Sequence, residues 1–141
     1  MITIYTDGAC SGNPGIGGWG AVILENEKDA IFLNGGNDNT TNNKMELKAA
    51  IESLKFFREK KEIKLVTDSK YLKDGIQSWI HNWKKNGWKT ANKQQVKNKE
   101  LWTELDFLSN KFEIKWNWVK GHSTDKLNNE VDLIAREAAN S

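Results

Sequence analysis

Apolar and polar residues alternate at the N-terminus in the way that predicts a β-strand with one buried face. Ile2 and Ile4 fall on one face of this strand, and Thr3 and Tyr5 fall on the other. Asp7 follows directly, so we expect the strand to end at a carboxylate. Ligands of open α/β sheets bind outside the carboxyl ends of the strands, which makes Asp7 a candidate functional residue.

The rest of the chain alternates between segments with strand and helix periods. In chain order these segments predict strands at 19–24 and 30–33, a helix at 44–60, a strand at 63–67, a short helix at 71–75 that runs into another at 76–83, a helix around 101–108, a strand at 112–119 and a last helix from about 128. Short connections would pair the first three strands antiparallel, and helical connections would make the last two parallel. We expect an α/β fold with a five-stranded mixed sheet flanked by helices, as one domain over residues 1–141.

Glycine is concentrated directly after the first predicted strand. Five glycines fall between residues 8 and 18, together with Asn13 and the only proline, Pro14. This composition predicts a tight turn in which backbone N–H groups approach a phosphate closely. The alternative is an ordinary surface hairpin with Asp7 as a turn aspartate.

Four acidic residues fall at predicted strand ends or near helix starts: Asp7, Glu46, Asp68 and Asp132. Asp68 ends the strand at 63–67 as Asp7 ends the first, and a helical crossover would bring both to the same edge of the sheet. Glu46 and Asp132 have an alternative role, because acids in the first turn often only complement the helix dipole. Two carboxylates about 4 Å apart repel by roughly 4 kcal/mol at an effective dielectric near 20, so a cluster of them must be protonated or neutralised by cations.

The metal ligands that the sequence offers are oxygen atoms. Cys10 is the only cysteine and there are two histidines, which excludes a Cys/His zinc cluster. Mg²⁺ or Mn²⁺ would suit the acids, and two such ions roughly 4 Å apart would use all four of them. His122 stands beside Gly121 in a polar loop, where a lone histidine is usually a solvated side chain.

Charge is distributed unevenly along a chain of net charge +2. No acidic residue falls between Asp74 and Glu100, whereas this window contains Lys84, Lys85, Lys89, Lys93, Lys97 and Lys99. Tryptophans are interleaved with these lysines, which suits a nucleic-acid backbone, although their helical spacing also suits a core. A phosphate-rich partner is the expectation.

Composition is that of a globular protein, with 38% hydrophobic and 28% charged residues. No apolar run approaches the roughly 18 residues of a membrane span, and the N-terminus shows no secretory signal pattern. We therefore expect a cytoplasmic protein that does not enter the membrane.

Six sequence motifs occur together and in order: TDGACSGNPG, TTNNKMEL, TDSKY, WIHNWKKNGWKT, WVKGH and NNEVD. With them the chain closely resembles the bacterial type 1 ribonuclease H family over essentially its whole length. The resemblance implies the ribonuclease H-like fold and hydrolysis of the RNA strand of RNA–DNA hybrids to 5′-phosphate products, largely independent of sequence. It also implies that Asp7, Glu46, Asp68 and Asp132 bind two Mg²⁺ ions, one activating water and one stabilising the departing 3′-oxygen, with His122 as a mobile proton-shuttling residue.

The same resemblance implies where the hybrid binds. Asn13, Thr41 and Asn43 would grip a phosphate of the DNA strand, and Gly8, Cys10 and Asn42 would lie along the groove near the RNA and the bases. A basic protrusion would form a wall for the DNA backbone with Trp79, Trp83, Lys84, Lys85, Trp88 and Lys89. Lys70 departs from the glutamine or asparagine that the family more often has there, which favours a phosphate contact in place of a minor-groove contact.

Two rival functions stay open at this point. A non-catalytic module that binds hybrids or duplexes could have the same fold, although clustered acids beside phosphate would gain it nothing. A nuclease of the same superfold with another substrate, such as a junction resolvase or a reverse-transcriptase nuclease domain, is the second rival. We expect a monomer that needs no obligate protein partner.

Overall fold

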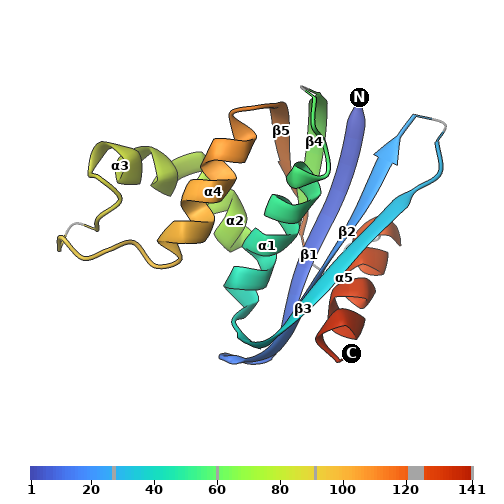
Figure 1. The fold of residues 1–141 in the computed structure, drawn as a ribbon, viewed down its shortest axis with the longest axis horizontal. Coiled ribbons are helices and arrows are strands. Elements are labelled where there is room, and N and C mark those ends of the chain that lie inside the picture. The colour runs from blue at the N-terminus through green and yellow to red at the C-terminus, as the bar shows by residue number, and fades with distance from the viewer. Residues whose placement is uncertain (27, 60, 91, 121–125, 141) are drawn as a thin grey trace.

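The structure is a computed structural model that describes residues 1–26, 28–59, 61–90, 92–120 and 126–140. Its centre is one five-stranded sheet in the order β3-β2-β1-β4-β5 (Figure 1). The strands are β1 (Ile2–Gly12), β2 (Gly15–Glu25), β3 (Ile31–Thr40), β4 (Glu62–Thr67) and β5 (Glu113–Trp118). Strands β1, β2 and β3 pair antiparallel, and β4 runs parallel to both β1 and β5. The predicted fold class is confirmed.

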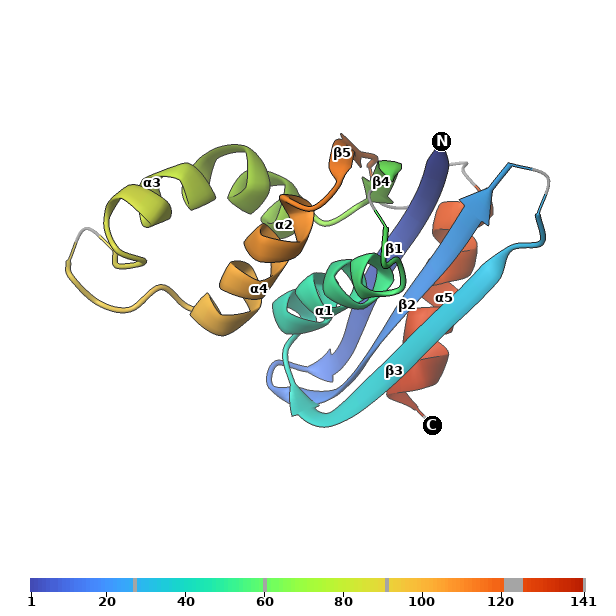
Figure 2. The same ribbon diagram turned by 45° about the horizontal axis from the view of Figure 1, so that its top comes forward.

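Helices cover both faces of this sheet. They are α1 (Asn42–Lys55), α2 (Lys70–Asp74), α3 (Ile80–Lys85), α4 (Lys99–Ser109) and α5 (Lys126–Ala139), with a π-helical turn, η1 (Gly75–Trp79), between α2 and α3. Figures 1 and 2 show α1 on one face and α5 on the other, with α4 beside α1. Within the described ranges, no helix has the length and apolar character needed to cross a bilayer.

The first strand is longer than predicted, and Asp7 does not end it. Residues 8–12 stay in β1 and pair with β2 as far as Gly12 and Gly15, so the tight turn is confined to Asn13 and Pro14 and does not begin directly after Asp7. Gly18 serves helix packing, because a Cβ there would lie 2.3 Å from the Ala139 nitrogen of α5. The parallel pairing of β1 with β4 does end at Thr6 and Thr67, so Asp7 stands where these two strands part.

The core lies mainly between α1 and the sheet. The apolar stripe predicted for α1 is confirmed, since Leu47, Ile51 and Leu54 are fully buried. Helix α4 adds Trp102 and Leu105, also fully buried, to the same core. Burial of large apolar side chains is the main stabilising term in folding, and here it fixes α1 and β1 against each other.

The segment of residues 75–90 and 92–98, called the basic protrusion here, extends from the side of the domain (Figure 2). Helix α3 ends at Lys85, and Gly87 follows with φ of 65°, a left-handed conformation that glycine adopts without strain. Gly87 thus follows directly on the end of the helix. Asn98 precedes α4, and its side chain makes no cap but donates to the Tyr71 hydroxyl.

Candidate active site

Asp7 and Glu46 face each other across the contact between β1 and α1. The Thr41 hydroxyl accepts a hydrogen bond from the Lys44 amide (3.2 Å), and this cap starts α1 at Asn42. Glu46 consequently lies beyond the first turn, with 3% of its surface exposed. The expectation of a first-turn, dipole-complementing glutamate is wrong, because the helix begins earlier than its apolar spacing indicated.

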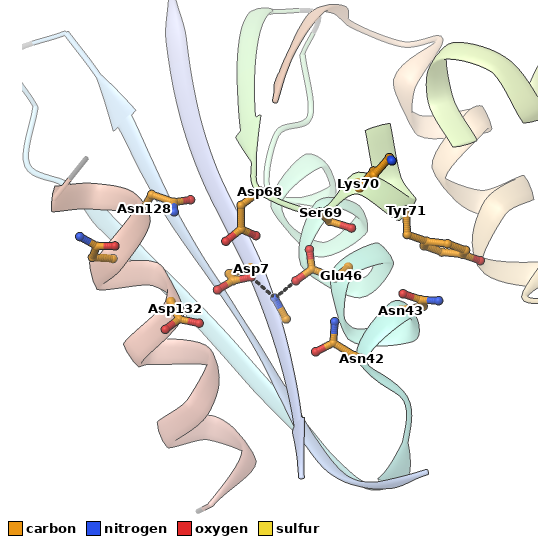
Figure 3. A pocket seen from close by; sticks show the side chains of 12 residues that line it. Asp7, Asn42, Asn43, Glu46, Asp68, Ser69, Lys70, Tyr71, Asn128 and Asp132 are labelled. Atoms are coloured by element: carbon orange, nitrogen blue, oxygen red, sulfur yellow. Dashed lines mark hydrogen bonds between the residues drawn. The ribbon is translucent and has the colours of Figure 1, made fainter. Parts of the chain in front are cut away.

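The Gly8 amide holds both carboxylates. It donates to Asp7 Oδ1 at 2.9 Å and to Glu46 Oε1 at 2.5 Å (Figure 3). A Cβ on Gly8 would lie 2.5 Å from the Glu46 backbone nitrogen, so only glycine lets α1 approach β1 this closely. The glycine after Asp7 thus serves to bring two acids together.

Asp68 completes a group of three acids. It follows β4 as predicted, and Ser69 then caps α2 by accepting from the Leu72 amide at 3.1 Å. Among the described residues, Asp7, Glu46 and Asp68 each offer a carboxylate oxygen within 4.8 Å of the others. Glu46 Oε2 is buried without a hydrogen-bond partner in the described part of the chain. An orphaned anionic oxygen among clustered carboxylates is the environment that a hard divalent cation fits.

Asp132 approaches the acids from α5, on the other face of the sheet (Figure 3). It lines the same cavity of about 380 Å³ as the other three acids. It does not belong to the three-acid group found among the described residues, and it forms an ion pair with Arg136 one turn further along α5. The described helix carries no acid in its first turn, so the dipole-complementing alternative for Asp132 is also wrong.

Burial and mutual repulsion raise the pKa of two of these carboxyls. For Asp7 the largest cause is burial, followed by the charge of Glu46, and its pKa lies far above the usual range. Burial likewise raises the pKa of Glu46 to about 7, and Asp68 adds to the effect. Two buried acids that resist ionisation indicate a site in which a bound cation stabilises the ionised carboxylates.

The polar residues implied for hybrid binding surround this cavity only in part. Asn42, Asn43 and Lys70 line it beside the acids, as does Gly8. Asn13 Oδ1 accepts from the Asn42 amide at 3.1 Å, so the turn between β1 and β2 is joined to the start of α1. Cys10 lies in an adjoining pocket, where its Sγ is 3.4 Å from the Thr40 carbonyl oxygen.

The tryptophans of the basic protrusion contribute to packing. Trp83 lies 5.5 Å from buried Trp102 and 6.2 Å from Trp88, measured between ring centroids. Both side chains are partly buried against the core, as the alternative interpretation expected, whereas Trp79 is 37% exposed.

The lysines of the protrusion differ from one another. Lys84 is paired with Asp106 of α4 at 3.3 Å. Within the described ranges, Lys85 and Lys89 are exposed and form no ion pair. Lys85 and Lys89 are therefore free to meet a phosphate, as are Lys93 and Lys97, which are also exposed.

His122 lies outside the described residues, so its predicted role stays a prediction. Sequence reasoning missed Asn128, which is 2% exposed and lines the acidic cavity from α5. It precedes Asp132 by four residues, and that helical spacing is the signal that would have placed both on one face. Tyr71 was missed as well; it lines the cavity, and its hydroxyl accepts from Trp102 Nε1 at 2.9 Å.

The sheet and its acids together define an α/β protein with an acidic centre, suited to a cation, where two parallel strands part. Residues 1–140 match the family model RNase H. A ribonuclease H from Wolbachia sp. subsp. Drosophila simulans (strain wRi) is 57% identical over 138 residues, which are 97% of this chain and 94% of the relative. One from Francisella tularensis subsp. novicida (strain U112) is 54% identical over 137 residues, or 97% of this chain and 90% of the relative. This chain belongs to the ribonuclease H family.

A solved structure shows the same architecture. LC9-RNase H1, described as a type 1 RNase H with the type 2 active-site motif, superposes with a TM-score of 0.87 at 29% identity. The match covers 99% of this chain and 72% of that one. The resemblance inferred from the sequence motifs is thereby confirmed.

Proposed function

We propose that this protein is an endoribonuclease that hydrolyses the RNA strand of RNA–DNA hybrids to 5′-phosphate products, with residues 1–141 as one catalytic domain. The observation that carries the proposal is the group of carboxylate oxygens of Asp7, Glu46 and Asp68 within 4.8 Å of one another. Relatives support the proposal as well, because proteins named ribonuclease H match nearly the whole chain. A module that only bound nucleic acid would gain nothing from buried anions beside phosphate.

The donor set fits Mg²⁺, with Mn²⁺ as the alternative, because every candidate ligand is a carboxylate oxygen. Asp7, Glu46 and Asp68 would hold the ions, and Asp132 would add the fourth carboxylate from α5. Two such ions supply a water of lowered pKa and stabilise the charge that develops on the leaving oxygen.

The protein's own contribution is to hold and shield these carboxylates. The Gly8 amide orients Asp7 and Glu46, and their burial excludes bulk water from that side of the cavity. Preorganised groups in a low-dielectric site act without reorganisation at the moment of reaction. For His122 we propose proton transfer near the reacting phosphate, a role that histidine fills more often than any other side chain.

Hybrid binding would follow the polar rim of the acidic cavity. We propose that Asn13, Thr41 and Asn43 bind phosphate of the DNA strand, that Gly8, Cys10 and Asn42 follow the groove beside the RNA, and that Lys70 binds phosphate. Trp79, Lys85 and Lys89, which are exposed, would form most of the wall against the DNA backbone, with Lys84 contributing less and Trp83 and Trp88 supporting it. We further propose a cytoplasmic monomer without an obligate protein partner.

The test presents one labelled RNA strand in three forms: single-stranded, paired with RNA and paired with DNA, each with Mg²⁺ and with chelator. We expect cleavage only of the DNA-paired form and only with metal, leaving 5′-phosphates. Binding of the hybrid without any cleavage would favour the binding module instead. Cleavage of the RNA duplex, or of a branched DNA junction added to the panel, would favour the other nucleases of this superfold.

A further inference from the structure

A second pocket adjoins the acidic cavity on the side of α5. It has a volume of about 310 Å³ and shares Gly8, Asn42 and Asp132 with the cavity. Its further lining comes from residues 9–11 of β1 and from Arg136, which no motif of the resemblance includes. A nucleic-acid strand that enters the acidic cavity and continues along β1 would run through this pocket.

Arg136 is placed to meet that strand. Its side chain is 64% exposed, and within the described part of the chain its ion pair is with Asp132, which is itself 34% exposed. An exposed ion pair contributes at most about 1 kcal/mol, so a phosphate can replace the carboxylate at little cost. The planar guanidinium is always charged and binds phosphate through two parallel hydrogen bonds.

Two basic side chains lie near the acids of the site. Among the described residues that line the two pockets, Lys70 and Arg136 are the ones with a positive charge. They lie on opposite sides of the acids, Lys70 beside β4 and Arg136 on α5. A polyanion that must approach several carboxylates is held most effectively when fixed cations stand on both sides of them.

We propose that Arg136 is a substrate-binding residue whose guanidinium binds a phosphate of the cut strand next to the phosphate in the acidic cavity. Arg136 lies four residues beyond Asp132, a rise of about 6 Å along α5, and this spacing places both side chains on one face of the helix. This proposal rests on the proposed function and adds a residue to its substrate site. Binding of the phosphate draws the guanidinium away from Asp132.

The experiment measures affinity for a fluorescent RNA–DNA hybrid in chelator, where nothing is cut, over a series of salt concentrations. Arg136→Gln should weaken binding by up to about five-fold and reduce the slope of log K against log salt by about 0.9, a value known for B-DNA. Arg58→Gln is the matched control, because Arg58 is the only other arginine and lines a pocket between α1 and α4 away from the acids. Its affinity and slope should equal those of the wild type.

A second comparison separates phosphate binding from mere neutralisation of Asp132. In the Asp132→Asn background, Arg136→Gln should still lower the affinity and the slope. Disappearance of both effects in that background would overturn the proposal, as would an Arg136→Gln variant that binds like the wild type. If the wild-type protein binds no hybrid at all, the proposed function fails together with this inference, whereas wild-type binding with an inert Arg136 refutes this inference alone.

Discussion

The acidic centre and the basic protrusion carry opposite charge and are built in opposite ways. Asp7 and Glu46 are 4% and 3% exposed, and one backbone amide from Gly8 holds both. Lys85 and Lys89 stand in solvent, on a segment attached to the core through its tryptophans. The acidic centre therefore has one well-defined geometry, whereas the lysine side chains can adjust to the position of a nucleic-acid backbone.

The two regions also differ in their effect on the stability of the folded protein. Buried carboxylates that repel one another destabilise the protein without a cation, so their presence indicates a function. Exposed lysines cost almost nothing, so their presence alone indicates little. Changes in the centre should consequently abolish chemistry, and changes in the protrusion should only tune binding.

The largest effect is expected for Asp7→Asn. Loss of one carboxylate from the cation-binding group removes several kcal/mol of charge stabilisation, so hybrid cleavage should fall by about 1000-fold or more. Hybrid affinity in chelator should stay within a few-fold of the wild type, because Asp7 keeps its proton without metal and its replacement removes neither a charge nor a phosphate contact. Single-turnover cleavage and fluorescence anisotropy measure the two quantities. A variant that cleaves as fast as the wild type would show that Asp7 is not part of the active site.

Gly8→Ala and Gly87→Ala compare the same substitution in both regions. The new Cβ at residue 8 meets the Glu46 nitrogen at 2.5 Å, so α1 must shift, at a cost of about 1–3 kcal/mol. Displaced carboxylates should reduce cleavage by about 100-fold. At Gly87 nothing lies within 4 Å, and the positive φ should cost about 1 kcal/mol with no loss of chemistry.

Urea unfolding and single-turnover cleavage of both glycine variants provide the measurements. Equal losses of cleavage at the two positions would contradict the view that the centre alone has a strict geometry.

Stability without metal should depend on pH through the acidic centre. Burial, with the charge of Glu46, raises the pKa of Asp7, and burial raises that of Glu46 to about 7. The folded protein then holds protons that the unfolded chain has released, so the free energy of unfolding should fall as pH rises from near 4 through about 7. The slope approaches roughly 1.4 kcal/mol per pH unit for each extra proton bound.

Urea unfolding in chelator at several pH values measures this dependence. Asp7→Asn should flatten it, since the asparagine has no proton to release. A free energy of unfolding that rises with pH over this range would show that the two carboxyls are ionised in the metal-free fold.

The smallest effects belong to the lysines of the protrusion. Lys85→Gln with Lys89→Gln should weaken hybrid binding several-fold and reduce the salt slope by up to about 1.8, that is, 0.9 for each contact. Lys84→Gln should change binding less, because Asp106 already pairs with Lys84 at 3.3 Å. Cleavage at saturating hybrid should be unaffected in all three positions. An unchanged salt slope in the double variant would show that the protrusion does not contact the substrate.

Much of this fold was predictable because its signals are local. The strand at Ile63 and the apolar stripe of α1 each depend on residues close together in the chain. The extension of β1 past Asp7 was not predictable in this way. Gly8 to Gly12 are held in the strand by pairing with β2 and by the close approach of α1, which are contacts between distant segments.

The candidate site shows the same division. The repeated Thr-Asp at the ends of two strand patterns located Asp7 and Asp68, and the structure brings both together with Glu46. The spacing of apolar residues placed Glu46 in the first turn of its helix. That spacing locates the buried stripe, but it does not show that the cap at Thr41 begins the helix earlier. The contribution of Asn128 and the pairing of Asp132 with Arg136 depend on how α5 lies against the sheet, which only tertiary packing determines.

Calorimetric titration of the wild-type protein with Mg²⁺ near pH 7, in buffers of different ionisation enthalpy, tests the acidic centre most directly. Asp7 and Glu46 retain protons when no metal is bound, so Mg²⁺ binding should release protons and the observed enthalpy should depend on the buffer. Asp7→Asn should bind Mg²⁺ more weakly and release fewer protons. Absence of Mg²⁺ binding by the wild type, or binding with no dependence on buffer and no change in Asp7→Asn, would contradict the assignment of these carboxylates as the cation-binding centre.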